Sequence, residues 1–310
     1  MDISIIIPNY NGETLLKKNL EKVYQEVIAY KSGKVEIIVV DDASSDESLS
    51  FLNGFSKTHQ STKILVNEKN LGFAPTVNKG VKTSIGDVVI LLNTDVYPEK
   101  GFLKPLLSHF SNAKVFAVGC LDKSIENGGT ILRGRGLGEW KRGFLVHRRG
   151  EVDKSNTLWV SGGSGAFRKS IWEKLGGFNE LYKPFYWEDI DLSYQALKSG
   201  YEVLFEKQSM VVHEHEKGAI KNKYSDFKIK TIAYRNQFIF VWENATDFSL
   251  RAAHIIWLPY HFVKALAGSD WAFCLGFVEA LILLPKIIIS GLRVKRQFVL
   301  SDKEVIGKFK

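Results

Sequence analysis

Short apolar runs alternate with segments of helical periodicity in the N-terminal part of the chain, and this alternation most constrains the fold. The apolar runs, rich in β-branched residues, span positions 3–7, 35–39, 63–66 and 87–92. Apolar side chains recur at helical spacing between these runs, at positions 13–29, 45–55 and 74–82. Strands that alternate with helices of about ten residues pair in parallel through right-handed crossovers. The pattern predicts an α/β fold with a mostly parallel sheet flanked by helices.

The alternation is weaker after Asp95. Further strands are predicted at 115–118, 158–160 and 202–205, and further helices at 170–176 and 189–198. Glycine ends or follows both of these helices, as is usual at helix C-termini. A basic, glycine-rich stretch at 127–150 separates the first two of these strands, and we expect it to form a mobile loop or a hairpin.

The composition becomes more apolar beyond about Asp247. Residues 271–290 form an apolar stretch of about 20 residues, long enough in principle to cross a bilayer, but Glu279, Pro285 and Lys286 interrupt it. Flanking tryptophans and a basic tail favour helices that lie in the membrane interface, with burial against protein and a true transmembrane span as the alternatives. We therefore expect a catalytic domain at 1–246, followed at 247–310 by C-terminal amphipathic or membrane-associated helices with a basic tail.

The formal net charge of +8 is unevenly distributed. Residues 286–310 hold seven Lys or Arg against two acids, and residues 133–149 hold six against one. Such clusters favour anionic partners, and because no nucleic-acid-binding motif is present, we expect a membrane surface or a phosphorylated substrate rather than nucleic acid. The only two cysteines are Cys120 and Cys274, and no secretory leader precedes the first strand. These features predict a cytoplasmic protein, peripheral on the inner face of the cell membrane.

Acidic side chains follow three of the predicted segments. Asp41 and Asp42 end the second strand, Asn93-Thr94-Asp95 follows the strand at 87–92, and Glu188-Asp189-Ile190-Asp191 follows an aromatic stretch. The C-terminal ends of the strands in an α/β sheet face one crevice, so these carboxylates can converge on one ligand. The arrangement predicts a metal-assisted enzyme that acts on a nucleotide sugar.

The first two acidic segments suit a nucleotide and a metal ion. A carboxylate at Asp41 or Asp42 can accept a hydrogen bond from a ribose hydroxyl or a base N–H, although both acids could instead only cap the turn. Asn93-Thr94-Asp95 is a degenerate Asp-x-Asp motif. One carboxylate and the oxygens of a diphosphate can complete the octahedral shell of Mg²⁺ or Mn²⁺, but the same tripeptide is also an ordinary turn sequence.

The third segment suits a general base. Three aromatic residues at 185–187 precede Glu188 and Asp189, and an apolar flank can raise the pKa of a carboxyl group into the range of a general base. The alternative is that the helix dipole alone favours acids at this helix N-terminus. His213 and His215 lie two residues apart in an extended segment, so both imidazoles are expected to face one site.

Taken in order and spacing, these motifs resemble the inverting family 2 glycosyltransferases. The shared segments of the first half are Pro8-Asn9-Tyr10-Asn11, 40–46, 70–73, 78–80 and 92–95. Those of the second half are 162–163, 176–180, 188–192 and His213, so the resemblance covers about residues 1–240. Within this family the sequence looks most like the rhamnosyltransferase-like branch that builds bacterial surface polysaccharides.

The resemblance implies a GT-A fold and a role for each matching position. The donor nucleotide is expected to bind Pro8, Asn9, Tyr10, Asn11, Asp42, Gly72, Asn78, Asn93 and Thr94. A divalent ion, Mn²⁺ or Mg²⁺, is expected on Asp95 and His213, because Asn93 leaves Asp95 as the only carboxylate of the Asp-x-Asp motif. The catalytic base falls on Asp189. Acceptor binding or support of the site is expected from Gly162, Gly163, Trp187, Glu188 and Asp191.

The implied reaction is the inverting transfer of a sugar from a UDP or dTDP sugar to a hydroxyl of a saccharide or polyprenyl-linked acceptor, in cell-surface polysaccharide synthesis. The C-terminal helices would hold the site at a membrane surface, and the sequence is compatible with a homo-oligomer. A sugar nucleotidyltransferase is disfavoured, because the loop at Pro8–Glu13 lacks the Gly-rich basic character of such enzymes. A catalytically silent, membrane-bound scaffold stays open as an alternative, because Asn93 weakens the metal motif.

Overall fold

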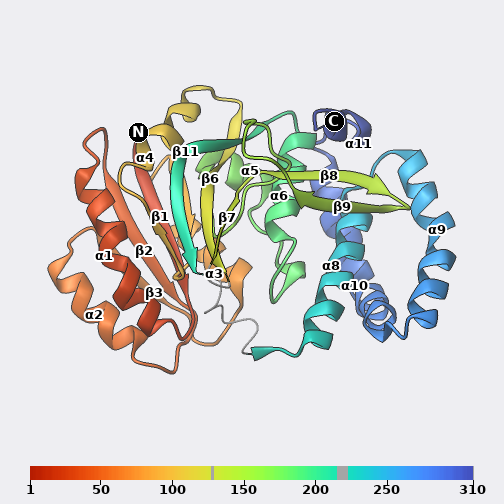
Figure 1. Cartoon of the computed structure of the whole chain (residues 1–310), viewed down its shortest axis with the longest axis horizontal. Helices are drawn as coiled ribbons and strands as arrows, with labels where there is room; N and C mark the ends of the chain where they lie inside the picture. The colour runs from red at the N-terminus through yellow and green to blue at the C-terminus, as the bar shows by residue number, and fades with distance from the viewer. Residues whose placement is uncertain (127–128, 215–222, 310) are drawn as a thin grey trace.

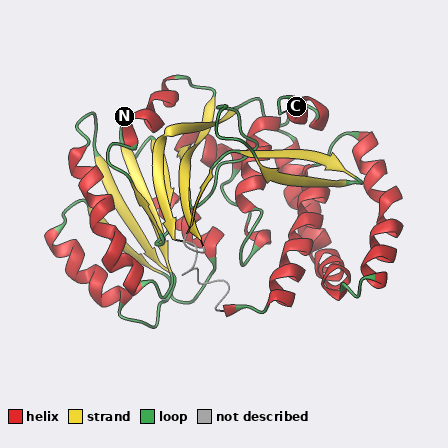
Figure 2. Ribbon diagram, in the orientation of Figure 1, coloured by secondary structure: helices red, strands yellow, loops and turns green. Residues whose placement is uncertain are grey.

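A computed structural model describes residues 1–126, 129–214 and 223–309. Its main sheet has the strand order β3-β2-β1-β4-β10-β6-β11-β5, with β7 paired to β6. The sheet occupies the left and centre of Figure 1, and the C-terminal helices lie to its right. Figure 2 shows the same division, with the strands of the main sheet gathered in one half and helices making up most of the other.

The first half of the chain forms a repeated β-α-β arrangement. Its elements are β1 (Ile3–Asn9), α1 (Glu13–Ala29), β2 (Val35–Asp41), α2 (Ser48–Thr58), β3 (Thr62–Val66), α3 (Phe73–Thr83) and β4 (Val88–Leu92). β1 pairs in parallel with β2 and β4, and β2 pairs in parallel with β3. The predicted α/β fold is confirmed, and these four strands form an all-parallel part of the sheet.

The second half of the chain adds strands of both directions. Its elements up to the last strand are β5 (Val96–Pro98), α4 (Leu103–Ser108), β6 (Val115–Glu126), β7 (Gly129–Arg133), β8 (Gly136–Lys141), β9 (Phe144–Arg149), β10 (Ser164–Arg168), α5 (Lys169–Leu175), α6 (Glu188–Lys198) and β11 (Glu202–Glu214). β10 runs antiparallel between β4 and β6, whereas β11 is parallel to β6 and antiparallel to β5. The complete sheet is therefore mixed.

Side chains alternate between the two faces of the sheet, and each face is covered by helices. Ile5 and Ile7 of β1 belong to a buried cluster with residues of α1, α2 and α4. Ile6 of β1 and Val40 of β2 belong to the other buried cluster, with residues of α3, α5 and α6. This two-sided burial explains why the first strands have continuous apolar sequences.

The predicted strand at 158–160 is wrong. Leu158 and Val160 are fully buried, but their N–H groups donate to Gly136 O and Ser193 Oγ, so the segment packs under other elements without joining the sheet. The strand of this region is β10, whose Ser-Gly-Ala-Phe-Arg sequence has no apolar run. β11 also extends well beyond the predicted 202–205 and brings His213 into register with Val96 of β5.

The basic stretch predicted as a loop or hairpin contains a hairpin. β8 and β9 form a separate two-stranded sheet, from the pair Gly136↔Arg149 to the pair Lys141↔Phe144. Its tip contacts α9 (Phe248–Ala267), where Arg142 Nη1 donates to Tyr260 Oη at 2.6 Å. The hairpin is thereby held at its outer end.

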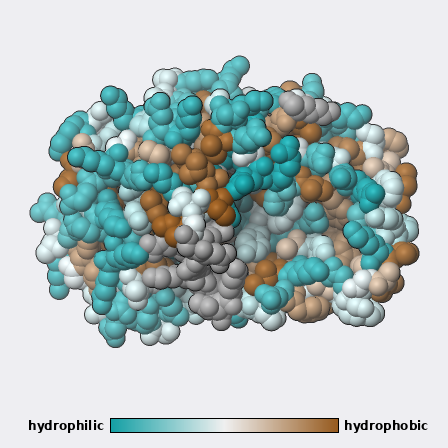
Figure 3. Space-filling view, in the orientation of Figure 1, coloured by the Kyte–Doolittle hydropathy of each residue, from teal (hydrophilic) through white to brown (hydrophobic). Residues whose placement is uncertain are grey.

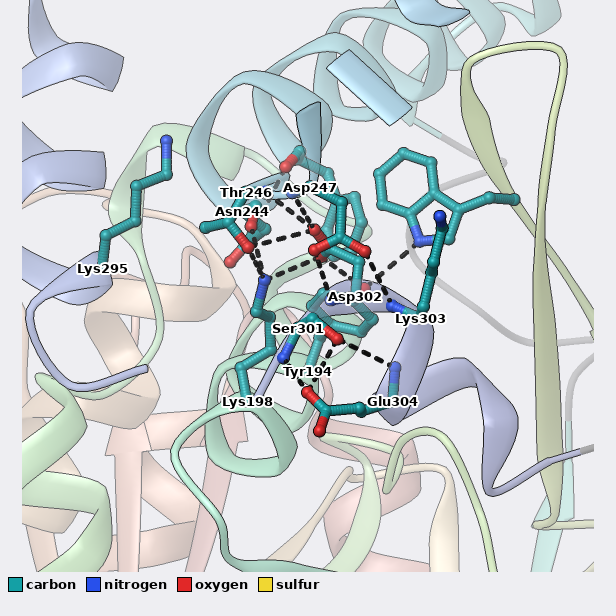
Figure 4. Close-up of polar contacts among 12 residues, drawn as sticks. Tyr194, Lys198, Asn244, Thr246, Asp247, Lys295, Ser301, Asp302, Lys303 and Glu304 are labelled. Atoms are coloured by element: carbon teal, nitrogen blue, oxygen red, sulfur yellow. Dashed lines mark hydrogen bonds and ion pairs between the residues drawn. The ribbon is translucent and has the colours of Figure 1, made fainter. Parts of the chain in front are cut away.

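The C-terminal helices pack against one another and against the sheet domain. A Cβ on Gly276 of α10 (Trp271–Lys295) would lie 2.8 Å from Thr231 O of α8 (Asp226–Asn244), and one on Gly291 would lie 3.3 Å from Glu243 O. The two helices therefore run side by side in the same direction. In the sequence, α9 links the end of α8 to the start of α10. The last helix, α11 (Asp302–Gly307), contacts α6 through the polar cluster drawn in Figure 4.

Candidate active site

Asp41 holds the turn that follows β2. Its carboxylate accepts hydrogen bonds from Asn9 Nδ2 at 2.7 Å and from the N–H and hydroxyl of Ser44 at 2.9 and 2.7 Å. Asn11, in the turn after β1, bonds the same loop through its N–H to Ser44 Oγ and its side-chain oxygen to Ser45 N. The turns after β1 and β2 are therefore locked side by side at the carboxyl edge of the sheet.

Asp42 joins the end of β2 to the turn that starts α3. Its Oδ1 accepts from Leu71 N and Asn67 Nδ2, and its Oδ2 accepts from Gly72 N, each at 2.8 Å. Gly72 has a φ of +88°, which favours glycine at this position. The structure thus brings the predicted residues Asp42 and Gly72 together, and Oδ2 keeps capacity for one more hydrogen bond from a ligand.

Asn78 joins α3 to the turn that follows α5. Its Nδ2 donates to Phe178 O at 2.8 Å, and its Oδ1 accepts from Phe178 N at 3.0 Å. The amide has a second N–H and a second acceptor position. The donor-binding role of Asn78 stays a prediction.

Two adjacent glycines connect the remaining predicted segments. Gly163 O accepts from Asn93 N at 3.0 Å, and a Cβ on Gly163 would lie 2.5 Å from Asn93 Nδ2. Gly162 N donates to Asp189 Oδ2 at 3.2 Å. One dipeptide therefore lies between the Asn93-Thr94-Asp95 segment and the predicted base, and the lack of a side chain on Gly163 permits its close approach to Asn93.

Asp95 and His213 lie next to each other, as predicted for a metal site. The distance from Asp95 Oδ2 to His213 Nε2 is 3.3 Å, and the second ring nitrogen, Nδ1, lies 3.0 Å from Asp122 Oδ2. Burial lowers the pKa of His213, but hydrogen bonds and charge from Asp122 and Asp95 outweigh it and raise that pKa to about 9. The ring of His213 thus lies between two carboxylates.

This donor set fits a divalent ion that takes few ligands from protein. Asp95 Oδ1 is buried, and within the described part of the chain it has no hydrogen-bond partner. Asp122 is placed to fix the orientation of His213, as carboxylates commonly do for histidine ligands. In residues 1–126, 129–214 and 223–309, no group of three or more His, Cys, Asp or Glu side chains is arranged to hold a metal alone. The remaining ligands would have to be diphosphate oxygens and water.

Asp189 lies in the first turn of α6, with its Oδ1 accepting from Ile190 N at 2.8 Å and its Oδ2 from Gly162 N. Burial raises the pKa of this carboxyl group, although these backbone hydrogen bonds oppose the shift. A raised pKa makes a carboxylate a better proton acceptor. The predicted apolar flank is present, because Trp187 is 6% exposed and Phe185 is also buried.

The turn before α6 is strained and is held by α8. Tyr186 and Trp187 have φ angles of +71° and +79°, which side-chain-bearing residues rarely adopt. Asn236 Nδ2 donates to the backbone carbonyls of Tyr182, Phe185 and Tyr186 at 3.1, 2.9 and 2.9 Å. Backbone strain of this kind persists where the surrounding structure enforces it. Here the strained turn sets the position of the start of α6, which carries Asp189.

Glu188 and Asp191 are buried in the first turn of α6, on either side of the base in the sequence. Asp191 is 1% exposed and accepts from Tyr182 Oη, Gln195 Nε2 and Asn244 Nδ2. Burial raises its pKa to about 7, against the effect of these hydrogen bonds. Burial and the nearby Asp189 raise the pKa of Glu188 well above its usual range. The contacts of Asp191 support α6 from within the protein, whereas Glu188 Oε2 is buried and has no hydrogen-bond partner among the described residues.

The sequence analysis did not identify three residues that support this site. The missed residues are Asp122, Asn236 and Glu243, which act through contacts distant in sequence. Glu243 of α8 accepts from Asn179 Nδ2 at 2.7 Å and from Ser290 Oγ of α10. His215 lies outside the described residues.

The fold and the site define a class of enzyme: sugar transferases with a GT-A fold that use a nucleotide-activated donor. A family model described as glycosyl transferase family 2 matches residues 4–176, and the chain belongs to this family.

Known proteins of related sequence or structure agree with this assignment. The O-antigen chain rhamnosyltransferase RfbN of Salmonella typhimurium is 25% identical over 219 residues, which are 69% of this chain and 67% of RfbN. The probable glycosyltransferase YdaM of Bacillus subtilis is 28% identical over 207 residues, so the match spans 66% of this chain and 48% of YdaM. The crystal structure of GalNAc-T7 with UDP, GalNAc and Mn²⁺ superposes with a TM-score of 0.64 at 20% identity, covering 78% of this chain and 48% of GalNAc-T7.

Proposed function

We propose that the protein transfers a sugar from a nucleotide diphosphate sugar, with UDP or dTDP as the nucleotide, to a hydroxyl group of a saccharide or lipid-linked acceptor. Transfer proceeds with inversion at the anomeric carbon. The observation that carries the proposal is the Gly162-Gly163 dipeptide, which bonds Asp189 through one residue and Asn93 through the next. The Gly162-Gly163 backbone thus connects the base, Asp189, with the donor-side turn at Asn93.

The donor nucleoside would bind where the turns after β1 and β2 are locked together. Asp42 keeps one acceptor position on Oδ2, and Tyr10 lies at the rim of the same turn, with Lys223 Nζ 4.6 Å above its ring. Asn93 and Thr94 follow β4 at the neighbouring position along the same edge, where Asn19 Nδ2 fixes Thr94 O at 2.9 Å. A nucleotide at the carboxyl edge of an α/β sheet is the usual arrangement.

Asp95 and His213 would hold a divalent ion, Mn²⁺ or Mg²⁺, against the donor diphosphate. When bound, such an ion supplies positive charge that stabilises the departing diphosphate. The relatedness to GalNAc-T7, whose crystal structure contains UDP and Mn²⁺, supports this choice of ion.

Asp189 would act as the general base. It takes the proton from the acceptor hydroxyl as the new bond from that oxygen to the anomeric carbon forms and the bond to the diphosphate oxygen breaks. A positioned base of this kind contributes typically about 10²- to 10⁴-fold in rate. Glu188 and Asp191 would hold α6 in place, and the basic β8–β9 hairpin would lie toward an anionic acceptor.

A nucleotide panel tests the donor and the metal together. Thermal unfolding is measured with UDP, dTDP, GDP and CDP, with and without Mn²⁺, for the protein and for Asp95→Ala. A ligand that binds the native state raises its melting temperature. We expect one nucleotide to stabilise the protein in a Mn²⁺-dependent manner, and we expect Asp95→Ala to lose that effect. Absence of any shift would make the catalytically silent scaffold the better account.

We further propose that α9 and α10 bind the inner surface of the cell membrane. Ile255, Ile256 and Val263 of α9 are each at least 67% exposed, and Ile282 and Ile289 of α10 are at least 70% exposed. Figure 3 shows apolar residues along the right-hand edge, where α9 lies in Figure 1. Among the described residues, α10 is the one helix that is long and apolar enough to cross a membrane. Only 28% of its most apolar 18-residue stretch is buried. Its packing along α8 favours an interfacial position over a span.

Point substitutions test this better than removal of residues 248–310, because α10 and α11 pack against α8 and α6. Flotation with anionic phosphatidylglycerol vesicles is compared for the protein and for the double variant Ile256→Ser/Val263→Ser. We expect the variant to bind fewer vesicles. The control is Ile85→Ser, because Ile85 is an exposed apolar residue that is far from α9 and α10 in the sequence. Equal flotation of all three proteins would contradict the membrane proposal.

A further inference from the structure

His147 and Trp159 belong to an aromatic cluster with Trp187, which lies two residues before the proposed base. His147 of β9 and Trp159 have ring centroids 5.4 Å apart at an interplanar angle of 74°. His147 is also 5.3 Å from the ring of Trp187, at 78°. Trp187 is buried, whereas Trp159 is partly exposed and His147 is exposed. The cluster therefore has a buried inner ring and two rings that reach the surface.

The β8–β9 hairpin leaves room for these rings. A Cβ on Gly136 of β8 would overlap the indole ring of Trp159, so this ring lies directly against the backbone of the hairpin. His147 pairs across the hairpin with Gly138, where a Cβ would lie 2.4 Å from Leu158 Cδ2, so the segment that carries Trp159 also packs against this pair. At the other end, Gly143 O is bonded by His254 Nδ1 of α9 at 2.9 Å. The rings are consequently fixed between two anchored segments.

Both chain segments that carry the indole rings converge on Asp189. Trp187 is the N-cap residue of α6, directly before Glu188 and Asp189. Trp159 precedes Gly162, whose N–H donates to Asp189 Oδ2. An acceptor hydroxyl at Asp189 would therefore belong to a molecule that also lies near these rings.

We infer that His147 and Trp159, whose rings are nearly perpendicular, form the platform against which the acceptor sugar ring packs. The inference rests on the proposed function and adds the acceptor subsite to it. A pyranose ring has a face of C–H groups, and the electron-rich face of an aromatic ring attracts such groups. Sites for small polar ligands are commonly lined by aromatic side chains with a few polar groups that fix orientation. Here Asp189 supplies the polar contact, and the platform contacts the apolar face of the sugar ring.

The experiment observes Trp159 directly in the full chain. The seven tryptophans are labelled with ¹⁵N, and the indole signal of Trp159 is assigned by its absence in Trp159→Phe. The protein, alone and with UDP and Mn²⁺, is titrated with the methyl glycosides of glucose, galactose, rhamnose and N-acetylglucosamine. Trp271 of α10, which is 60% exposed, serves as an internal control for nonspecific effects.

We expect at least one glycoside to shift the Trp159 signal and to leave the Trp271 signal in place. His147→Ala should weaken the apparent affinity about 3- to 10-fold, as expected for loss of one aromatic contact. His147→Phe should retain it, and Val146→Ala, on the other face of β9, should match the unmodified protein.

Two results would overturn the platform: no glycoside shifts Trp159, or His147→Ala binds as tightly as the unmodified protein. These results are distinguishable from failure of the proposed function. Nucleotide binding in the thermal panel without a response of Trp159 rejects the platform alone. Absence of nucleotide binding instead counts against the donor site.

Discussion

Asp302 and Lys198 form an ion pair of 2.9 Å in which both side chains are fully buried. Asp302 also accepts from Tyr194 Oη at 2.8 Å and from the N–H groups of Thr246 and Asp247 at 2.7 and 2.9 Å. Asp247 in turn accepts from the N–H groups of Asp302 and Lys303, both at 3.1 Å, so the starts of α9 and α11 cap each other (Figure 4). The end of the chain is thereby fastened to α6, the helix that carries the proposed base.

Asp302→Ala is expected to lower the free energy of unfolding by about 3–5 kcal/mol. The substitution leaves the ammonium group of Lys198 buried without its carboxylate, and breaking a buried pair in this way is strongly destabilising. Urea denaturation followed by circular dichroism measures the change. Lys303→Ala alters the neighbouring side chain and keeps the backbone N–H, so it should stay within about 0.5 kcal/mol. Equal stability of Asp302→Ala and Lys303→Ala would show that the pair does not fasten the C-terminus.

Asp189→Asn is expected to reduce turnover about 10²- to 10⁴-fold, because the amide cannot accept the acceptor proton. Nucleotide affinity should be unchanged, since the carboxylate contacts Gly162 and Ile190 rather than the donor-side turns. The assay follows release of the nucleoside diphosphate from the donor that the thermal panel identifies. Glu180→Gln, an exposed acid near α6, is the control. Turnover within about threefold of the unmodified protein would remove Asp189 from the role of base.

The parallel part of the sheet could be predicted because β1 to β4 are buried on both faces and have continuous apolar sequences. β10 could not, since Ser164 and Gly165 give no strand signal and the segment becomes a strand only between β4 and β6. The opposite error occurred at Leu158 and Val160, which are apolar because they are buried beneath the hairpin. Burial was evident in the sequence, but the pairing partner was not.

The site shows the same limit. Asp95 and His213 carry local motifs, and the structure places them in contact. Asp122 and Asn236 have no local signal, because their partners lie 91 and about 50 residues away in sequence. The position of Asn78 matches the family motif, but its contact with the backbone of Phe178, 100 residues away, could not be predicted. In each of these cases, a contact between residues distant in sequence determines what the side chain does.

Asp122→Ala is expected to weaken Mn²⁺ binding about 10- to 100-fold. Asp122 orients the ring of His213 through Nδ1, and loss of such an outer contact has typically this effect on metal affinity. Calorimetric titration of Mn²⁺ in the presence of the identified nucleotide gives the dissociation constant. Glu99→Gln, which removes a carboxylate paired with the adjacent Lys123, should leave it unchanged. An equal affinity in Asp122→Ala would mean that His213 needs no orienting carboxylate.

Asn236→Ala is expected to destabilise the protein by about 1–3 kcal/mol and to lower turnover as well. The substitution removes a donor shared by three backbone carbonyls of the strained turn before α6, and buried acceptors without partners are costly. Denaturation and turnover are measured on the same preparations, with Lys230→Ala, a solvent-facing change on α8, as the control. A loss of stability with full turnover would indicate that the turn does not position Asp189.

The stability of the protein is expected to fall as pH rises, because of the buried pair Asp191 and Glu243. Burial, together with the nearby Asp191, raises the pKa of Glu243 to about 8, and burial raises that of Asp191 to about 7. Lys295 opposes the shift of Glu243 only in part. The folded state then binds more protons than the unfolded state, so the contribution is complete below the ordinary carboxyl pKa and is lost as pH rises through about 7 and 8.

Glu243→Gln isolates this contribution, because glutamine stays neutral and can still accept from Asn179 through its oxygen and donate to Ser290 Oγ. Urea denaturation at acidic and at alkaline pH measures how much the free energy of unfolding falls between the two. This decrease should be roughly 2–4 kcal/mol larger for the unmodified protein than for Glu243→Gln. Glu139→Gln, on the exposed face of β8, should retain the full decrease. Parallel pH profiles for Glu243→Gln and the unmodified protein would mean that Glu243 is already ionised in the fold, with its charge balanced by Lys295.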